Sequence, residues 1–364
     1  MKNRFLQWAS NGKNACPRGG GAWGALSRPP IQRINSSIST GSRRTQPSIS
    51  TGSHRLTNVG YEDPALRSLR WWRALRALVR LPHRGGGVGL VILAVVVAVG
   101  LLAPWLAPHG YDDQDLDTML RAPIWAGGAW SHVLGTDPLG RDLLSRIVYG
   151  ARTSLLLALA SVLIAGVVGV TLGLVSGWAG GRIDALVMSV VEVQLSMPYL
   201  LFAIAFMALL QPGLQNLVIV LVLRSWVVYA QLVRVSVLSM KQREFVTVAL
   251  ALGASDTRIL WRHVLPNVVA PAVVVSTFQL AELIIVESSL SFLGLGVQPP
   301  MPSWGSMLSQ GREYISSAWW LVTFPGVAII LTVLGANLTG DAVRDLMDPR
   351  LRGLDRARRR ARRT

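Results

Sequence analysis

Charged side chains interrupt several long apolar runs of this 364-residue chain. Placing a charge in lipid costs free energy, so each of these side chains is expected to have a function. They are Glu192, Arg224, Arg234, Glu282 and Glu287. Such residues pair with one another, relay protons or contact a polar solute that crosses the membrane. Arg234 and Glu192 lie near the ends of their runs, where a charged group reaches water, whereas Glu287 lies closer to the middle. Glu287 is therefore the leading candidate for a translocation path or a structural lock, with Glu282, Glu192 and Arg234 as further candidates.

A second polar group follows the first apolar run and consists of His132, Asp137, Arg141 and Asp142. Its spacing fits no usual pattern of metal ligands, and "GTDPLGRD" is typical of a turn leading into an amphipathic helix. The remaining histidines are scattered along the sequence and form no cluster: His54, His83, His109 and His263. No GxxxxGK[ST] segment occurs, so the sequence lacks a P-loop for ATP. We expect no catalytic residue, no metal site and no cofactor bound by this chain.

The elements that must position these residues are membrane helices. Hydrophobic residues make up 51% of the chain and charged residues only 15%, which is typical of a polytopic membrane protein. Requiring about 20 apolar residues for each crossing predicts an all-α fold with six transmembrane helices. The expected spans are Val88–Ala107, 154–178, 186–210, 214–238, 268–294 and 318–340.

The net charge of +17 is concentrated at the two ends of the chain. Basic residues that flank spans mark the cytoplasmic side, so both termini are expected inside, with 108–150 external and 239–267 cytoplasmic. Residues 1–60 are predicted to be a disordered extension, 61–87 an amphipathic cytoplasmic helix and 341–364 a basic cytoplasmic tail. These ends suit anionic membrane lipid, and nucleic-acid binding is not expected.

The segment "EFVTVALALGASDTRILWRHVLP" lies in the long cytoplasmic loop and predicts two short helices joined at a glycine. Gly253 can adopt the left-handed conformation that ends a helix, and Ser255 can cap the next one. Asp256 then lies in a first helical turn, and Pro266 is expected to break the chain before the fifth span. The apolar face of the first helix comprises Phe245, Val248, Ala249 and Leu252. Because the chain has no soluble domain to cover this face, we expect a cytoplasmic partner to bind it.

This loop resembles the "EAA…G…LP" loop of ABC importer permeases, whose short helix docks in a groove of the ATPase subunit. The family's Gly and Leu-Pro positions correspond to Gly253, Leu265 and Pro266, whereas only Ala249 agrees in the Glu-Ala-Ala positions. The peptide-importer branch carries its Glu three residues earlier, as Glu244 does here. That branch usually has Arg where this chain has Leu250, which leaves one polar contact to the ATPase open. The other residues similar to that branch are Ala251, Leu252, Ala254, Ser255, Asp256 and Arg262–Asn267.

Further segments between residues 88 and 352 resemble the C-type permease of dipeptide, oligopeptide and nickel importers. In order, they are His132–Leu155, Val191–Leu201, Glu287–Gly305 and Gly340–Arg352. The resemblance implies a MetI-like type I ABC importer permease fold over residues 88–340 in the cytoplasmic (inner) membrane. It also implies a homologous permease as heterodimer partner, two ATPase subunits or domains that hold ATP and Mg, and an extracytoplasmic solute-binding protein.

The resemblance further implies that this chain moves peptides or related small solutes and is not itself an enzyme. It assigns ATPase coupling to Glu244, Ala249, Ala251, Gly253, Ala254, Ser255, Asp256, Leu265 and Pro266. The alternative is a secondary transporter driven by an ion gradient, with the intramembrane glutamates as proton sites. Six spans without an internal repeat disfavour it.

Overall fold

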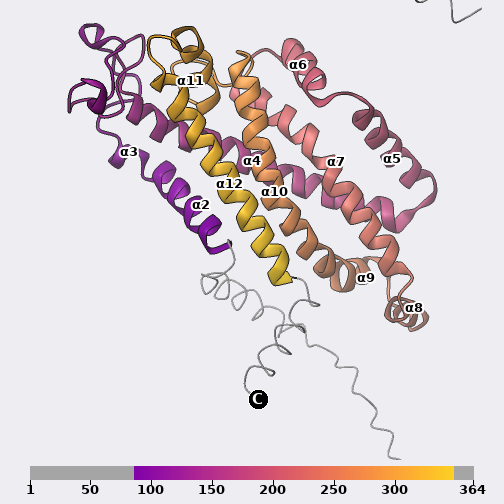
Figure 1. The fold of residues 1–364 in the computed structure, drawn as a ribbon. Helices are drawn as coiled ribbons and strands as arrows, with labels where there is room; N and C mark the ends of the chain where they lie inside the picture. The colour runs from indigo at the N-terminus through magenta and orange to yellow at the C-terminus, as the bar shows by residue number, and fades with distance from the viewer. Residues whose placement is uncertain (1–85, 348–364) are drawn as a thin grey trace, which may run out of the picture. The chain divides into compact units, whose positions relative to one another are not determined.

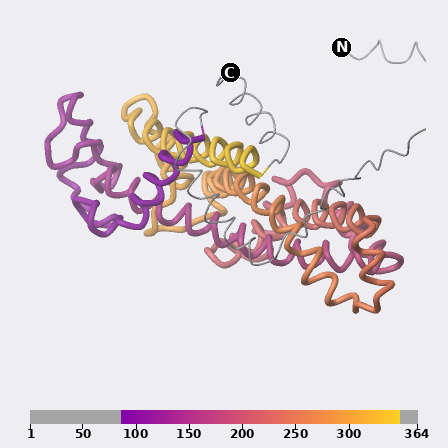
Figure 2. The backbone as a smooth tube through the Cα atoms, turned by 90° about the horizontal axis from the view of Figure 1, so that it is seen from below, coloured from indigo at the N-terminus to yellow at the C-terminus, as the bar shows by residue number. Residues whose placement is uncertain are grey.

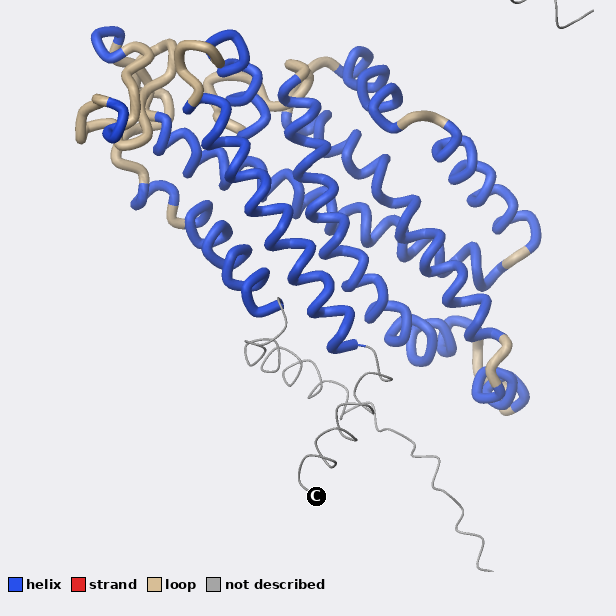
Figure 3. Tube along the Cα trace, viewed as in Figure 1, coloured by secondary structure: helices blue, strands red, loops and turns tan. Residues whose placement is uncertain are grey.

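The apolar runs form helices in the computed structural model, which describes residues 86–347 of the chain (Figure 1). All named secondary structure in this part is helical (Figure 3). The elements expected for 1–60 and for most of 61–87 and 341–364 lie outside the described residues. In chain order the helices are α2 (Gly86–Leu101), α3 (Ala103–Leu106), η1 (Leu116–Thr118), η2 (Ile124–Ala126), α4 (Leu143–Ala179), α5 (Gly181–Ser196), α6 (Tyr199–Leu210), α7 (Leu214–Lys241), α8 (Glu244–Ala251), α9 (Asp256–Ile259), the π-helical η3 (Leu260–Val264), α10 (Leu265–Phe292), α11 (Trp304–Gly311), η4 (Arg312–Tyr314) and α12 (Trp320–Met347).

Four helices in the described part are long and apolar enough to cross a membrane. They are α4, α7, the continuous helix Asp256–Phe292 and α12. α5 and α6 together make a fifth candidate, and α2 is a shorter apolar helix of 16 residues. The expectation of an all-α polytopic membrane protein is therefore confirmed.

The third expected span, 186–210, is not one helix. α5 ends at Ser196, α6 begins at Tyr199, and the two helices are bent by 97°. Met197 is extended (φ −95°, ψ 133°), the conformation that a residue before proline prefers. Pro198 has no backbone N–H to donate across this break. The span is thus interrupted at the step from Met197 to Pro198, which a count of apolar residues does not weigh.

The fifth expected span also differs from the prediction at Pro266. The helix does not break there, because α9, η3 and α10 form one continuous helix. Pro266 lies in the first turn of α10, directly after the π-helical turn. That wider turn relieves the clash between a proline ring and the preceding carbonyl groups. The second short helix of the predicted loop is therefore the start of the span itself.

Glycines on α4 allow it to lie directly against α7. A Cβ on Gly173 would lie 2.6 Å from the Ala230 carbonyl oxygen, and one on Gly177 would lie 2.9 Å from Val237 Cβ. A Cβ on Gly169 would collide with the Trp226 carbonyl oxygen. Small residues at such a contact let helix backbones approach closely in lipid, as the glycine-rich sequence of this region predicts.

The bundle has two distinct ends. α8 and α9 lie at one end, and residues 107–142 lie with α11 at the other (Figures 1 and 2). The first residue of α2 lies at the same end as the last turns of α12, since a Cβ on Gly86 would collide with Ala342. The described chain thus begins and ends on the side where α8 and α9 lie (Figure 1).

Candidate functional site

The loop at 239–267 consists of a short helix joined through one glycine to the start of a long helix. α8 begins at Glu244 and ends at Ala251, and Gly253 follows in the left-handed region with φ +79°. The N–H of Ala254 donates to the Ala249 carbonyl at 3.0 Å and closes the end of α8. The left-handed glycine predicted from the sequence is confirmed.

One face of this loop is held firmly on the bundle. Val246 of α8 and Ile259 of α9 are buried in a cluster with Val233 and Val237 of α7 and Val268 of α10. α8 is thereby packed through Val246 onto helices that are candidate membrane spans.

The other face of the loop is apolar and open. Phe245, Val248 and Leu252 are 42%, 56% and 82% exposed. Ala249, expected on the same face, is instead half-buried against the cluster beneath. Exposed apolar side chains of this kind mark an interaction surface, for another protein or for a membrane.

The remaining loop residues singled out in the sequence lie around this face. Ser255 occupies the N-cap position of α9, but its side chain makes no capping hydrogen bond. Ala254 and Leu265 are half-buried, and the exposed residues are Glu244, Ala251, Ser255, Asp256 and Pro266.

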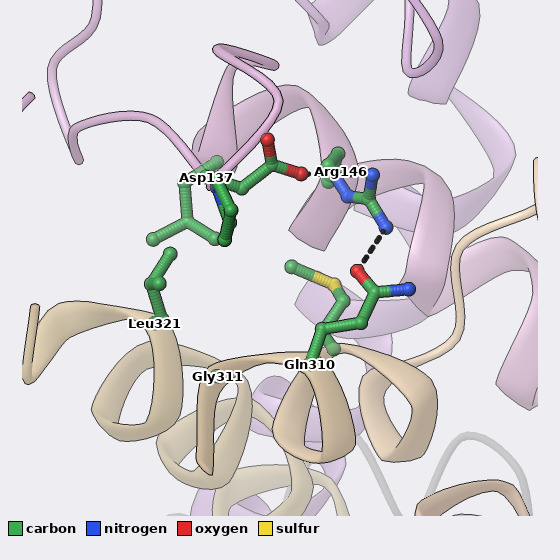
Figure 4. A pocket seen from close by; sticks show the side chains of 8 residues that line it. Asp137, Arg146, Gln310, Gly311 and Leu321 are labelled. Atoms are coloured by element: carbon green, nitrogen blue, oxygen red, sulfur yellow. Dashed lines mark hydrogen bonds and ion pairs between the residues drawn. The ribbon is translucent and has the colours of Figure 1, made fainter. Parts of the chain in front are cut away.

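At the opposite end of the bundle, Asp137 anchors residues 107–142, the outer segment. Its Oδ2 accepts a hydrogen bond from Arg141 Nε at 2.7 Å and lies 3.0 Å from Arg146 Nη1. Arg146 Nη2 also donates to Gln310 of α11 at 3.1 Å (Figure 4). The space among these side chains is about 10 Å³, which is no more than one water needs. We therefore interpret the Asp137 ion-pair group as structural. α4 starts directly after this turn at Leu143 and is apolar, so no separate amphipathic helix follows.

The structure places His109, one of the histidines expected to be scattered, against His132 of the second polar group. The ring centroids of His109 and His132 lie 4.9 Å apart, and His132 Nδ1 lies 3.1 Å from Asp142 Oδ1. The other oxygen of Asp142 accepts from the Ser145 N–H at 2.8 Å and caps α4. The expectation that His109 belongs to no cluster is wrong, because the fold returns the outer segment to the start of α4.

Glu287 of α10 is fully buried against α4. Its Oε2 accepts a hydrogen bond from Ser154 of α4 at 3.0 Å, and its Oε1 accepts one from Ser291 at 2.8 Å. The carboxyl group therefore joins two candidate spans. It is not exposed on the surface of this chain. Of the two roles considered for Glu287, we propose the structural lock, because its carboxyl group joins α10 to α4.

Arg234 and Glu192, the other candidates near run ends, do not meet each other. Arg234 pairs instead with Asp184 of α5, through Nε at 2.5 Å and Nη2 at 2.6 Å. Ser176 of α4 donates to the same carboxylate. Glu192 is exposed. The Arg234 contact holds α4, α5 and α7 together.

The helices and loop described above correspond to a known family of transport proteins. Residues 169–353 match the family described as "Binding-protein-dependent transport system inner membrane component". Residues 70–123 match the "N-terminal TM domain of oligopeptide transport permease C". The di/tripeptide transport system permease protein DppC of Pseudomonas aeruginosa (strain UCBPP-PA14) is 44% identical over 271 residues, which are 74% of this chain and 89% of that protein. The chain belongs to this family of permeases.

The permease is also 41% identical over 291 residues to the dipeptide transport system permease protein DppC of Alkalihalophilus pseudofirmus, which covers 80% of this chain and 93% of that one. A solved chain of the inward-facing MetNI methionine ABC transporter is 18% identical, with a TM-score of 0.49 over 56% of this chain and 97% of that chain. Family membership confirms the resemblance to ABC importer permeases. Membership in this family identifies a multi-pass inner-membrane subunit that is not catalytic. A binding-protein-dependent ABC system implies ATPase and binding-protein partners.

One ion pair of the permease lies at an open face within the candidate spans. Arg224 of α7 donates through Nη2 to Glu282 of α10 at 3.1 Å, and the Glu282 side chain is 44% exposed. Tyr199, the first residue of α6, lies beneath the guanidinium, with its ring centroid 5.2 Å from Arg224 Cζ. Both charges were evident in the sequence, but their pairing was not predicted.

Sequence reasoning missed the partners of these charges. Asp184, Tyr199 and Ser154 were not singled out, although each contacts one of the charged candidates. Asp184 carried the one available signal, since a carboxylate beside an apolar run needs a cation nearby. Serine and tyrosine are common in membrane helices and give no comparable signal.

Proposed function

We propose that this chain is the transmembrane subunit of an ATP-driven importer for di- or oligopeptides. It would pair with a homologous permease, with the translocation path between the two. Two ATPase subunits or domains, which hold ATP and Mg, would bind the loop at 244–266, and an extracytoplasmic binding protein would deliver the peptide. The peptide substrate is supported by relatives whose names describe di/tripeptide and dipeptide transport.

The observation that carries the coupling role is the open apolar face of α8 on a packed base. Phe245, Val248 and Leu252 are exposed on a helix whose other side is buried through Val246. A groove on an ATPase subunit would cover these side chains and remove apolar surface from water. The polar and small residues around them would complete the contact: Glu244, Ala249, Ala251, Gly253, Ala254, Ser255, Asp256, Leu265 and Pro266.

Six crossings, with both termini in the cytoplasm, fit this role. α2 spans about 24 Å at 1.5 Å per residue, and the apolar residues through Leu106 lengthen it toward the roughly 30 Å of a bilayer core. Counting α2 and the bent pair α5–α6 with the four long helices gives an even number of crossings. The basic ends of the sequence and the position of α8 at the end where α2 begins support the same orientation.

The continuous helix from α9 to α10 supplies a mechanism. When the ATPases close on ATP, they would move α8 and α9, and that movement would pass into α10 without an intervening hinge. α10 is joined to α4 through Glu287 and Ser154, so both helices would shift together. The bundle would then rock between inward- and outward-facing states.

A charge on the exposed apolar face tests the coupling role. The Leu252→Asp variant places a charge where the ATPase groove is expected, and Leu252 is 82% exposed, so the permease fold is preserved. We expect the ATPase to be lost from the purified complex, together with hydrolysis stimulated by loaded binding protein.

The matched control is Leu116→Asp, which places the same charge on a 65% exposed leucine of the outer segment. The ATPase should co-purify with this variant as it does with wild type. Unchanged co-purification and hydrolysis in Leu252→Asp would remove the coupling role from this loop. Ion-gradient-driven uptake without any ATPase would favour the secondary-transporter alternative.

A further inference from the structure

The bend between α5 and α6 opens a polar cavity inside the candidate spans. Its volume is about 140 Å³, larger than any single water requires. Arg224 lies about 15 Å along α7 at 1.5 Å per residue, deep enough to be within the hydrocarbon region. The lining residues are Gln194, Leu195, Met197, Tyr199, Phe202 and Arg224.

Two hydrogen-bond donors at this cavity have no acceptor among the described residues. They are Nε of Arg224 and the hydroxyl of Tyr199, and both atoms are buried. The third polar lining residue, Gln194, is already engaged, since its Oε1 accepts from Trp226 Nε1 at 3.2 Å and its Nε2 donates to the Leu223 carbonyl. Leaving a buried donor unpaired costs free energy, and the cost is greater for a charged group. A planar guanidinium beside a hydroxyl matches the oxygens of a carboxylate.

The Arg224–Glu282 ion pair indicates which way this cavity faces. Glu282 bonds to Nη2 of Arg224 and leaves Nε free. Both side chains remain partly exposed on the surface of this chain, at 24% for Arg224 and 44% for Glu282. Charged groups at this depth do not face lipid, because lipid cannot solvate them. The face therefore turns toward a partner subunit or a water-filled path.

We propose that Arg224 and Tyr199 bind the C-terminal carboxylate of the peptide as it crosses the membrane. Glu282 holds Arg224 in position between transport events and releases it in part when the carboxylate arrives. This inference rests on the proposed function and adds to it a contact site and the chemical group recognised there. A charged carboxylate passing through a low-dielectric region needs a cation along its route, and Arg224 supplies one.

The test is a double-mutant cycle between Arg224 and the peptide carboxylate. The full complex in proteoliposomes, with saturating loaded binding protein, transports Ala-Ala and its C-terminal amide, in wild type and in Arg224→Gln. Saturation removes differences in delivery by the binding protein, so the rates report the passage through the membrane. We expect Arg224→Gln to lower the rate for Ala-Ala by about tenfold or more and the rate for the amide by less than about twofold.

Two further variants separate recognition from structure. The swap Arg224→Glu with Glu282→Arg preserves an ion pair between α7 and α10, so a structural role predicts recovery of Ala-Ala transport. The proposed role predicts that transport stays low while assembly and ATP hydrolysis remain. Tyr199→Phe removes one donor and keeps the ring, and it should lower the rate for Ala-Ala more than the rate for the amide.

Equal loss for the two substrates in Arg224→Gln, or recovery of transport by the swap, would overturn the inference. Should Arg224→Gln fail to assemble, the Tyr199→Phe comparison decides in the same way. A wild-type complex that moves neither substrate would instead contradict the proposed peptide function, so the two failures are distinguishable.

Discussion

The close contact between α4 and α7 gives the sharpest test of the packing. A methyl group at position 173 would lie 2.6 Å from the Ala230 carbonyl oxygen and 2.8 Å from Val233 Cβ. The carbonyl belongs to a helix backbone and cannot move aside alone, so Gly173→Ala must push the helices apart. Overpacking of this kind costs about 1–3 kcal/mol.

Gly166→Ala is the matched control on the same helix. Its Cβ would lie 3.8 Å from the ring of Tyr229, an ordinary contact. Both substitutions gain the same helix propensity, roughly 1 kcal/mol, so the difference between them isolates the collision. We expect Gly173→Ala to be less stable than Gly166→Ala by about 1–3 kcal/mol.

The assay is reversible unfolding of the purified permease in detergent, followed by tryptophan fluorescence. Gly166→Ala should unfold at or above the wild-type midpoint, and Gly173→Ala below the midpoint of Gly166→Ala. Equal midpoints for the two variants would refute the close approach of α4 and α7 as described.

Two more predictions concern the buried carboxyl groups of Asp137 and Glu287. Asp137→Ala leaves the guanidinium groups of Arg141 and Arg146 buried without their carboxylate, and we expect a loss of about 3–5 kcal/mol, visible as faster proteolysis of the outer segment; unchanged proteolysis would argue against the anchor. Glu287→Ala removes the acceptor of Ser154 and should destabilise the bundle by roughly 1–3 kcal/mol, whereas Glu287→Gln keeps an acceptor and should lose less. Equal thermal midpoints for the two Glu287 variants would contradict the structural lock.

Local features of the loop were predictable from the sequence. Gly253 is left-handed because a glycine followed by Ser and Asp ends one helix and begins another. Helix positions followed from apolar runs, since a chain in lipid must satisfy its backbone within each helix. The functional assignment followed from the ordered family segments, from His132 to Arg352.

Features that depend on contacts between distant residues were not predictable. The meeting of His109 and His132 requires the outer segment to fold back on α4. The partner of Arg234 is Asp184, although Glu192 was an equally available carboxylate, and only the packing of α5 decides between them. The continuity of the helix through Pro266 has a different, local cause. It depends on the π turn at Leu260–Val264, for which the sequence carries no simple signal.

Peptide uptake into proteoliposomes that contain the complete complex and its binding protein distinguishes an ATP-driven importer from a transporter driven by an ion gradient. Uptake is followed at constant ATP, with and without an uncoupler, and with the ATPase subunits present or omitted. If this chain is the permease of an ATP-driven importer, uptake requires the ATPases and persists with the uncoupler. Uptake that continues without the ATPases and stops with the uncoupler would contradict the proposed function.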